Sequence, residues 1–365
     1  MNGVIIIDKP AGWTSHDVVN RMRRILNQRS VGHLGTLDPL ATGVLPLVVG
    51  NLTRLAQFYT ASEKSYEGVI RFGFATNTYD ADGEPVESDM GTAARGCPEG
   101  RRPDLNSEQL QKLAVGFLGV IEQIPPPFSA KKIHGVPAYK LARKKEEVIL
   151  KPVQVEIKEF VITSVEGDRA HFRARVSSGT YMRSVAHEMG QRIGCGAHLE
   201  SLRRTAAAEF DIAQAHTLEE IESAANGYRE QAEAQIKACH SDRSFAFPKG
   251  KGSGVEKPAV LPGSGTEAWV GSRSPVLPRG TTTIETQPFA GLESFFIHPR
   301  QLLPQFPSVT ADEATAARIR SGRPINLPEL SRARQVKVFA GQRELLAIAT
   351  RVAGTLFHPK IVFPE

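Results

Sequence analysis

The sequence predicts an α+β protein: a mixed, largely antiparallel sheet flanked by helices, followed by a small β-rich module. Three observations support this. Strand-like stretches alternate irregularly with amphipathic helical segments over residues 1–238. Residues 239–294 are rich in Gly, Pro, Ser and Thr and show no apolar period, which is typical of a flexible linker or insertion. Strand patterns resume over residues 295–365. This mixed order of elements favours α+β over a doubly wound sheet.

The first elements can be placed one by one. Residues 4–7 are an apolar run closed by Asp-Lys-Pro, as in a buried strand. A helix follows, with Thr14 as N-cap and Asp17 three residues later in a capping box. Residues 44–49 and 66–74 read as further strands, with Ile70, Phe72 and Phe74 on one face, and residues 110–117 as an amphipathic helix.

The later elements follow the same rules. Strands are expected at residues 153–157 and 171–176, and a helix through residues 185–193. Thr217 and Glu220 predict the start of another helix, and Thr310 and Glu313 that of a short helix in the last module. The module's strands are expected at residues 335–339, 345–350 and 356–363.

Composition limits the class of protein. Lys and Arg exceed Asp and Glu by 45 − 39 = 6, with a pI near 9.2, which permits a polyanionic partner without requiring one. No run approaches the roughly 18 apolar residues that span a bilayer, and no signal-peptide core opens the chain, so we expect no membrane contact and a cytoplasmic location. Without a heptad pattern, a monomer is expected.

The usual cofactor and metal motifs are missing. Residues 250–254 read GKGSG but follow no strand, so a phosphate-binding loop is not indicated. Asp80 and Asp82 lack the glutamate of a calcium loop and read as a turn. His187 and His198 lack a third ligand, and the three cysteines lie far apart. We therefore expect neither a metal nor a cofactor.

The most informative segment is residues 31–46, VGHLGTLDPLATGVLP. Pro39 keeps Asp38 out of helical conformation, although an isolated Asp-Pro pair is usually just a turn. The whole string resembles the catalytic motif of the TruB family of tRNA pseudouridine synthases. Other motifs that resemble this family follow in its order, through about residue 222: GVIIIDKP at 3–10, KSYE and DADG within 64–83, QIPPPFSA at 123–130, SGTYMRS at 178–184, and GCGAHL to LRRT within 194–205.

The resemblance implies the pseudouridine synthase fold with a PUA-like C-terminal module, matched only loosely here. It implies isomerisation of uridine to pseudouridine at position 55 in the T loop of tRNA. That reaction breaks the C1′–N1 bond and joins C5 to C1′, so it needs a carboxylate at the sugar but no redox or phosphate cofactor. Asp38 is the expected catalytic carboxylate. A tRNA-binding folding helper whose catalysis is secondary is the alternative.

The resemblance also implies roles for other residues. Arg183 would keep Asp38 ionised and aimed; Tyr66 would pack on the uracil and help remove the C5 proton; Tyr181 and Leu202 would line the base pocket. The target base must be flipped out, and His33 would occupy the space that flipped bases vacate. Taken singly, Arg183 would more often be a surface arginine, His33 a solvent-facing loop residue, and the others core residues.

RNA contacts are expected from a basic insertion at about residues 124–152. Phosphate contacts of this kind position the substrate and make affinity depend on salt. The expected partner is the T-arm stem-loop of tRNA, although a solvated charged loop would look the same without the family context. The basic cluster, with an aromatic residue able to pack on a sugar or base, comprises Lys131, Lys132, Tyr139, Lys140, Arg143, Lys144 and Lys145.

Overall fold

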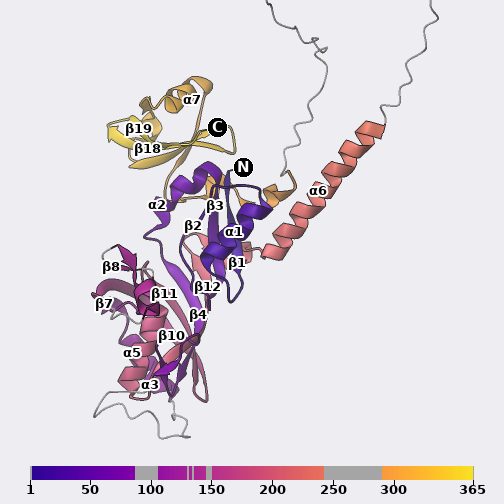
Figure 1. The fold of residues 1–365 in the computed structure, drawn as a ribbon. Helices are drawn as coiled ribbons and strands as arrows, with labels where there is room; N and C mark the ends of the chain where they lie inside the picture. The colour runs from indigo at the N-terminus through magenta and orange to yellow at the C-terminus, as the bar shows by residue number, and fades with distance from the viewer. Residues whose placement is uncertain are drawn as a thin grey trace, which may run out of the picture.

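A computed structural model describes residues 2–86, 106–129, 131–133, 135–144, 150–241 and 290–364. The α+β class is confirmed: the described residues form a ten-stranded sheet, a five-stranded sheet and two small hairpins (Figure 1). The path of the large sheet runs, in spatial order, through β14 (Phe296–Ile297), β1 (Gly3–Lys9), β3 (Thr42–Val49), β12 (Ala197–Ala207), β4 (Lys64–Phe72), β11 (Arg169–Val176), β10 (Val153–Glu166) and β7 (Gly119–Gln123).

Neighbouring strands along this path are antiparallel except β12 and β3, which run parallel. The predicted alternation is present on β4, where Ile70 and Phe72 are buried on one face. The expected extension to Phe74 is wrong: β4 ends at Phe72 because Gly73 takes a φ of +113°, which side-chain-bearing residues rarely adopt. Phe74 is exposed beyond that bend.

Shorter elements complete the first part of the chain. β2 and β13 pair with β3 and β12 at the side of the large sheet, and β5–β6 and β8–β9 are the two hairpins. Their bounds are β2 (Val31–His33), β5 (Ala75–Thr76), β6 (Pro85–Val86), β8 (Lys132–Ile133), β9 (Val136–Pro137) and β13 (Phe210–Asp211).

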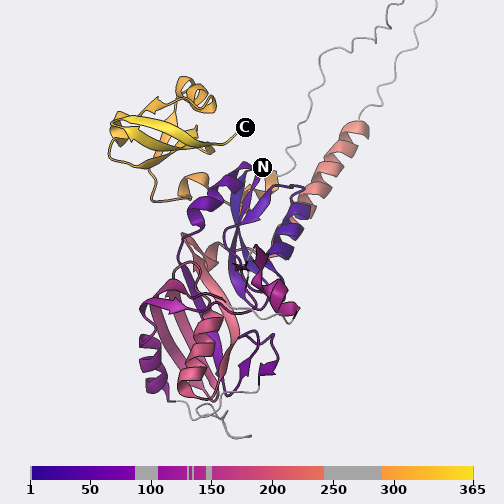
Figure 2. The ribbon, with the colours of Figure 1, turned by 60° about the vertical axis from the view of Figure 1, so that its left-hand side comes forward.

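Six helices of this part have these bounds: α1 (Ser15–Ile25), α2 (Ala56–Tyr59), α3 (Ser107–Val115), α4 (Ala138–Arg143), α5 (Met182–Ile193) and α6 (Leu218–Ser241). The capping box of Thr14 and Asp17 is confirmed at α1, and Glu220 N–H donates to the Thr217 hydroxyl at α6. Apolar faces of α1, α3 and α5 pack on the sheet in one continuous core (Figure 2).

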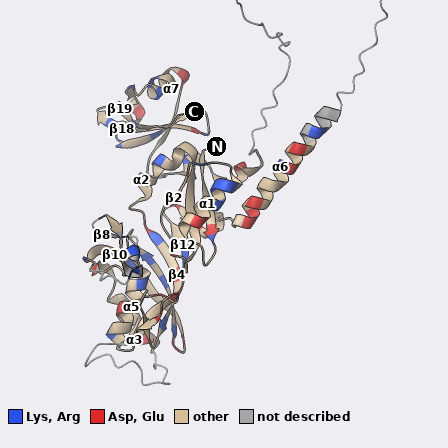
Figure 3. Ribbon diagram, viewed as in Figure 1, with Lys and Arg blue, Asp and Glu red and all other residues tan. Residues whose placement is uncertain are grey.

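Helix α6 projects away from the sheet (Figure 1). Most of its charged residues are acidic, whereas α1 carries arginines in its last turn (Figure 3). Arg21 and Glu222 join the two helices at 2.6 Å. The predicted linker therefore begins within a helix, while residues 242–289, including the GKGSG stretch, lie outside the described residues. None of the described helices is long and apolar enough to cross a membrane.

The C-terminal module is a curled sheet in the order β15 (Ser308–Ala311), β17 (Gln335–Ala340), β18 (Glu344–Ala353), β19 (Leu356–Val362), β16 (Ile325–Asn326), covered by α7 (Glu313–Arg320). The expected cap of α7 is wrong. Asp312, not Thr310, is the N-cap, and its carboxylate accepts from Thr315 N–H at 2.8 Å. Thr310 is a β15 residue, and its hydroxyl accepts from Arg300.

The module is joined to the first part by a second, shared core that includes Val4, Ile6, Phe339 and Phe363. A 3₁₀ segment, Ala290–Phe295, leads into β14, which pairs with β1. The stretch expected to begin the module at residue 295 thus starts as a strand of the large sheet.

A polar bridge lies at this junction. The Tyr59 hydroxyl donates to Glu209 Oε1 at 2.6 Å, and that oxygen accepts from Leu303 N–H at 2.8 Å. Burial and the Glu209 carboxylate both raise the pKa of Tyr59, so its proton stays in place. The bridge connects α2 with the segment that enters the module.

Replacing Tyr59 with Phe should lower the free energy of unfolding by roughly 1–3 kcal/mol, because a hydrogen bond to a carboxylate is lost inside a packed junction. Urea unfolding followed by circular dichroism measures this. Glu209→Gln keeps an acceptor oxygen and should cost less than Glu209→Ala. Equal midpoints for wild type and Tyr59→Phe would show that the bridge contributes nothing.

Candidate active site

Asp38 lies on the loop between β2 and β3, and the backbone on both sides of it is anchored. The carbonyls of Gly35 and Thr36 accept from Arg204 at 3.1 and 3.3 Å. Both polar groups of the Leu37 backbone bond the Ser15 hydroxyl, at 2.8 and 3.0 Å. Every peptide carbonyl from residue 35 to 37 therefore has a partner outside the loop.

A buried lysine anchors the other side. Lys9 Nζ donates to Pro39 O at 3.1 Å and to Trp13 O at 2.7 Å, and Gly12 N–H donates to Pro39 O at 2.9 Å. Burial lowers the pKa of Lys9 to about 8, against an opposing effect of the nearby Asp38 charge. Regular structure is absent from this loop, yet side chains hold it on both flanks.

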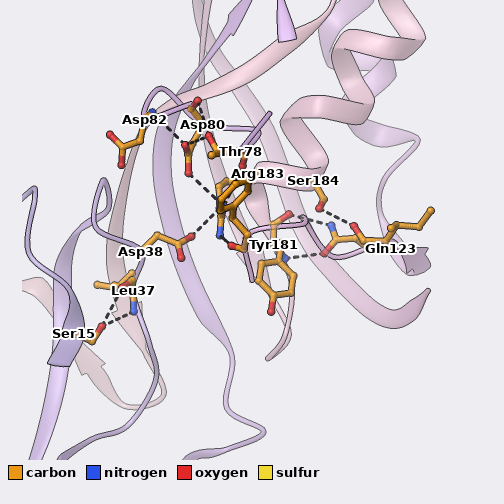
Figure 4. Close-up of polar contacts among 12 residues, drawn as sticks. Ser15, Leu37, Asp38, Thr78, Asp80, Asp82, Gln123, Tyr181, Arg183 and Ser184 are labelled. Atoms are coloured by element: carbon orange, nitrogen blue, oxygen red, sulfur yellow. Dashed lines mark hydrogen bonds and ion pairs between the residues drawn. The ribbon is translucent and has the colours of Figure 1, made fainter. Parts of the chain in front are cut away.

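Arg183, in the first turn of α5, lies between two carboxylates (Figure 4). Its Nε is 2.9 Å from Asp38 Oδ2, and its Nη1 is 3.4 Å from Asp80 Oδ2. The Nε–H makes no aligned hydrogen bond, so the contact with Asp38 is electrostatic. The Arg183 side chain is 5% exposed and that of Asp38 38% exposed, so the cation is buried while the carboxylate stays accessible.

Backbone carbonyls complete the surroundings of Arg183. Nη1 donates to Thr78 O at 3.1 Å and Nη2 to Phe128 O at 3.0 Å. The β5–β6 loop, the segment after β7 and the Asp38 loop therefore converge on one guanidinium.

The sequence predicts a turn at Asp80 and places it in the DADG motif. The turn is present, and the structure adds that the carboxylate is buried against Arg183. Burial raises the pKa of Asp80, while hydrogen bonding from Thr78 and the Arg183 charge oppose that rise. Its position in the DADG motif was the available signal, but its partner could not be read from spacing.

The start of α5 is fixed from β7. Gln123 is buried, and its amide accepts from Tyr181 N–H at 2.8 Å and donates to Tyr181 O at 3.1 Å. Ser184 Oγ donates to Ile124 O at 2.8 Å (Figure 4). Burial and the nearby Asp38 charge both raise the pKa of Tyr181. Sequence reasoning missed Gln123 as the residue that sets this helix start.

Tyr66 and Leu202 lie on neighbouring strands, β4 and β12, and both are buried. Register pairs Tyr66 with Arg204 and Leu202 with Gly68, so these side chains share one face of the sheet. Arg204 reaches the Asp38 loop from that face. The same face thus presents Tyr66 and Leu202 toward the side on which the loop lies.

His33 is half-buried on β2, and its Nδ1 accepts from Gly35 N–H at 3.4 Å. Burial, with the nearby Arg204 and His16 charges, lowers the pKa of His33, so the imidazole is mainly neutral at pH 7. It is neither fully solvent-facing nor part of the core.

The basic insertion is described in part. Lys131, Lys140 and Lys144 are exposed around the β8–β9 hairpin and α4. Lys145, and the side chains of Lys132, Tyr139 and Arg143, lie outside what the structure describes. Within the described ranges, no group of three or more His, Cys, Asp or Glu side chains could hold a metal ion.

Comparison with known proteins shows the family to which the chain belongs. Residues 23–182 match the model for the N-terminal domain of the TruB family of pseudouridylate synthases, and residues 183–241 match that for the C-terminal domain of tRNA pseudouridylate synthase B. The chain is 43% identical to tRNA pseudouridine synthase B of Solibacter usitatus, over 99% of this chain and all of that protein. The chain belongs to the TruB family.

Other TruB proteins match a shorter part. The tRNA pseudouridine synthase B of Opitutus terrae is 44% identical over 61% of this chain and 88% of its own length. Among solved structures, a chain of a Cbf5–Nop10–Gar1 complex aligns with 100% of this chain and 85% of its own, with a TM-score of 0.62 and 20% identity. That likeness shows a shared fold. Together with the family match, it confirms the expected pseudouridine synthase fold.

Arg204 and its neighbour Arg203 allow a matched test of the loop anchor. Arg204→Met should lower the free energy of unfolding by about 2–4 kcal/mol, because it removes three hydrogen bonds from a buried guanidinium, to the carbonyls of Gly35, Thr36 and Val44. Arg203→Met removes a half-exposed pair with Asp8 and should cost less than about 1 kcal/mol. Similar urea midpoints for the two variants would contradict this assignment.

Proposed function

We propose that this TruB protein isomerises uridine to pseudouridine at position 55 in the T loop of tRNA, with Asp38 as the catalytic carboxylate. The observation that carries the proposal is the 2.9 Å contact between the buried Arg183 and the accessible Asp38, on a loop whose backbone is anchored on both sides. Membership of the family and the names of its relatives support tRNA as the substrate.

The pair suits the chemistry. An opposite charge at this distance favours the ionised carboxylate. An ionised Asp38 can attack C1′ or stabilise the positive charge that develops on the sugar as the C1′–N1 bond breaks. Because Arg183 also contacts Asp80, it stays paired when Asp38 gives up its charge to the substrate.

The base pocket is proposed on the sheet face next to this pair. Leu202 and Tyr181 would hold the flipped uracil, and Tyr66 would pack on it and help remove the C5 proton. The half-buried, neutral ring of His33 suits apolar packing in the space left by the flipped bases. Unstacking the base costs a few kcal/mol, which contacts of this kind would offset.

Recognition of the T-arm is proposed to come from the exposed lysines of the basic insertion, with further contacts from the C-terminal module. We propose that the chain is divided into a catalytic domain over residues 1–238, a connecting tract over 239–294 and a module over 295–365. Strand β14, at the start of this last range, belongs to the large sheet of the catalytic domain. The proposed working form is a cytoplasmic monomer.

The experiment is tritium release from a T-arm stem-loop labelled at uridine C5. Wild type should release tritium, and Asp38→Asn should be slower by more than about 1,000-fold, because its amide can neither attack nor carry the charge. Binding of the same RNA should change less than about twofold. Asp82→Asn is the control, since Asp82 is an exposed carboxylate in the same region.

Two outcomes would contradict the proposal. Loss of binding together with activity in Asp38→Asn would make Asp38 structural. RNA binding by wild type without tritium release, from the stem-loop and from unmodified tRNA alike, would favour the folding-helper alternative.

Asp80→Asn should reduce turnover about 10- to 100-fold, because Arg183 loses a buried counter-charge and its aim toward Asp38 loosens. The RNA dissociation constant should stay within about twofold. Single-turnover rates and filter binding separate the two effects, and an equal loss in both would instead indicate a fold defect.

A further inference from the structure

Behind the Arg183–Asp80 pair lies a second contact between the same two segments. Tyr79 and His187 stack with ring centroids 3.8 Å apart and planes inclined by only 10°. Tyr79 directly precedes Asp80 in the β5–β6 loop, and His187 lies four residues after Arg183 on α5, about one helical turn. The stack and the ion pair therefore join the same loop to the same helix.

Tyr79 adopts a conformation that its residue type avoids. Its φ is +65°, in the left-handed region where a Cβ atom is crowded. Backbone contacts hold it there: Tyr79 O accepts from Leu199 N–H at 3.0 Å, and Tyr79 N–H donates to Thr76 O at 3.2 Å. A strained conformation of this kind persists only where its surroundings impose it.

The left-handed conformation of Tyr79 also determines which groups face Arg183. The residues on either side of Tyr79 meet one guanidinium nitrogen: Thr78 O lies 3.1 Å from Nη1 and Asp80 Oδ2 3.4 Å from it. A left-handed residue between them turns the chain so that both can face the same atom. Any shift of Tyr79 would move both groups.

The position of His187 is also energetically unfavourable. Its Nδ1 is buried and makes no hydrogen bond, while its Nε2 lies 3.1 Å from the Gln191 amide nitrogen. Buried polar atoms without a partner are uncommon in native structures and call for an explanation. Within the described residues His187 belongs to no candidate metal cluster. Its close contact with the β5–β6 loop, which carries Asp80, is the stack on Tyr79.

We propose that the Tyr79–His187 stack is a positioning pair that holds the Asp80 loop against α5, so that Arg183 is aimed at Asp38. Neither ring needs to touch the RNA; both act through the Asp80–Arg183 contact. The inference rests on the proposed function only for its effect on turnover. Its effect on Arg183 itself can be measured without any reaction.

Four variants separate the rings from the backbone. Tyr79→Gly removes the ring but tolerates the positive φ, and His187→Ala removes the other ring. Tyr79→Phe and His187→Phe keep an aromatic face. With enzyme in excess over a T-arm stem-loop, Tyr79→Gly and His187→Ala should slow the single-turnover rate about 10-fold, with RNA affinity within about twofold of wild type. The two Phe variants should stay within about twofold of wild type in both measurements.

A coupling test distinguishes positioning from general packing. If the stack acts through Asp80, His187→Ala should slow the Asp80→Asn enzyme by less than about twofold, because the Asp80–Arg183 ion pair is already absent from that enzyme. A full 10-fold effect in that background would overturn the proposal, as would a wild-type rate in His187→Ala.

The reaction-free measurement is the ¹H–¹⁵N signal of Arg183 Nε–H, identified by its loss in Arg183→Lys. It should shift or broaden in His187→Ala and Asp80→Asn and stay at the wild-type position in His187→Phe. An unchanged signal in His187→Ala would refute the positioning role, whether or not the protein makes pseudouridine. Failure of wild type to release tritium, with the expected NMR result, would refute the proposed function alone.

Discussion

The buried guanidinium of Arg183 is the constraint on which the rest of the site depends. An ion in the protein interior is very unfavourable unless opposite charges and hydrogen-bond acceptors surround it. Here these partners come from separate parts of the chain: Asp38, Asp80 with the Thr78 carbonyl, and the Phe128 carbonyl. One cation therefore brings three segments to a common point, and the loss of any of them removes one of the partners of the buried charge.

Two further buried cations bind backbone carbonyls instead of carboxylates. Lys9 and Arg204 bond backbone carbonyls of the Asp38 loop and its neighbours, and no described carboxylate pairs with either. Their charges are thus used to hold polypeptide rather than to balance acids. A loop without regular structure gains in this way the rigidity that a helix or strand draws from its own hydrogen bonds.

The C-terminal module is attached by apolar packing and by hydrogen bonds inside the junction. The shared core excludes water, and Glu209 pairs Tyr59 with the Leu303 backbone inside the junction. Strand β14 adds backbone pairing to β1. In the same sheet, β12, which carries Arg204 and pairs with the Tyr66 strand β4, lies two strands beyond β1. The module is therefore tied directly to the sheet that also supports the proposed base pocket.

The linear pattern was enough for much of this protein: the strand alternation of β4, the capping box of α1, the Asp38 loop and the family could all be predicted, because they depend on neighbours in the chain. Only folding showed that Asp80 faces Arg183, that Arg204 holds the Asp38 loop while adjacent Arg203 does not, and that Asp312 caps α7. Thr78 and Arg183 are 105 residues apart. No local pattern encodes which distant groups a buried charge will meet, since sheet register and helix packing decide it.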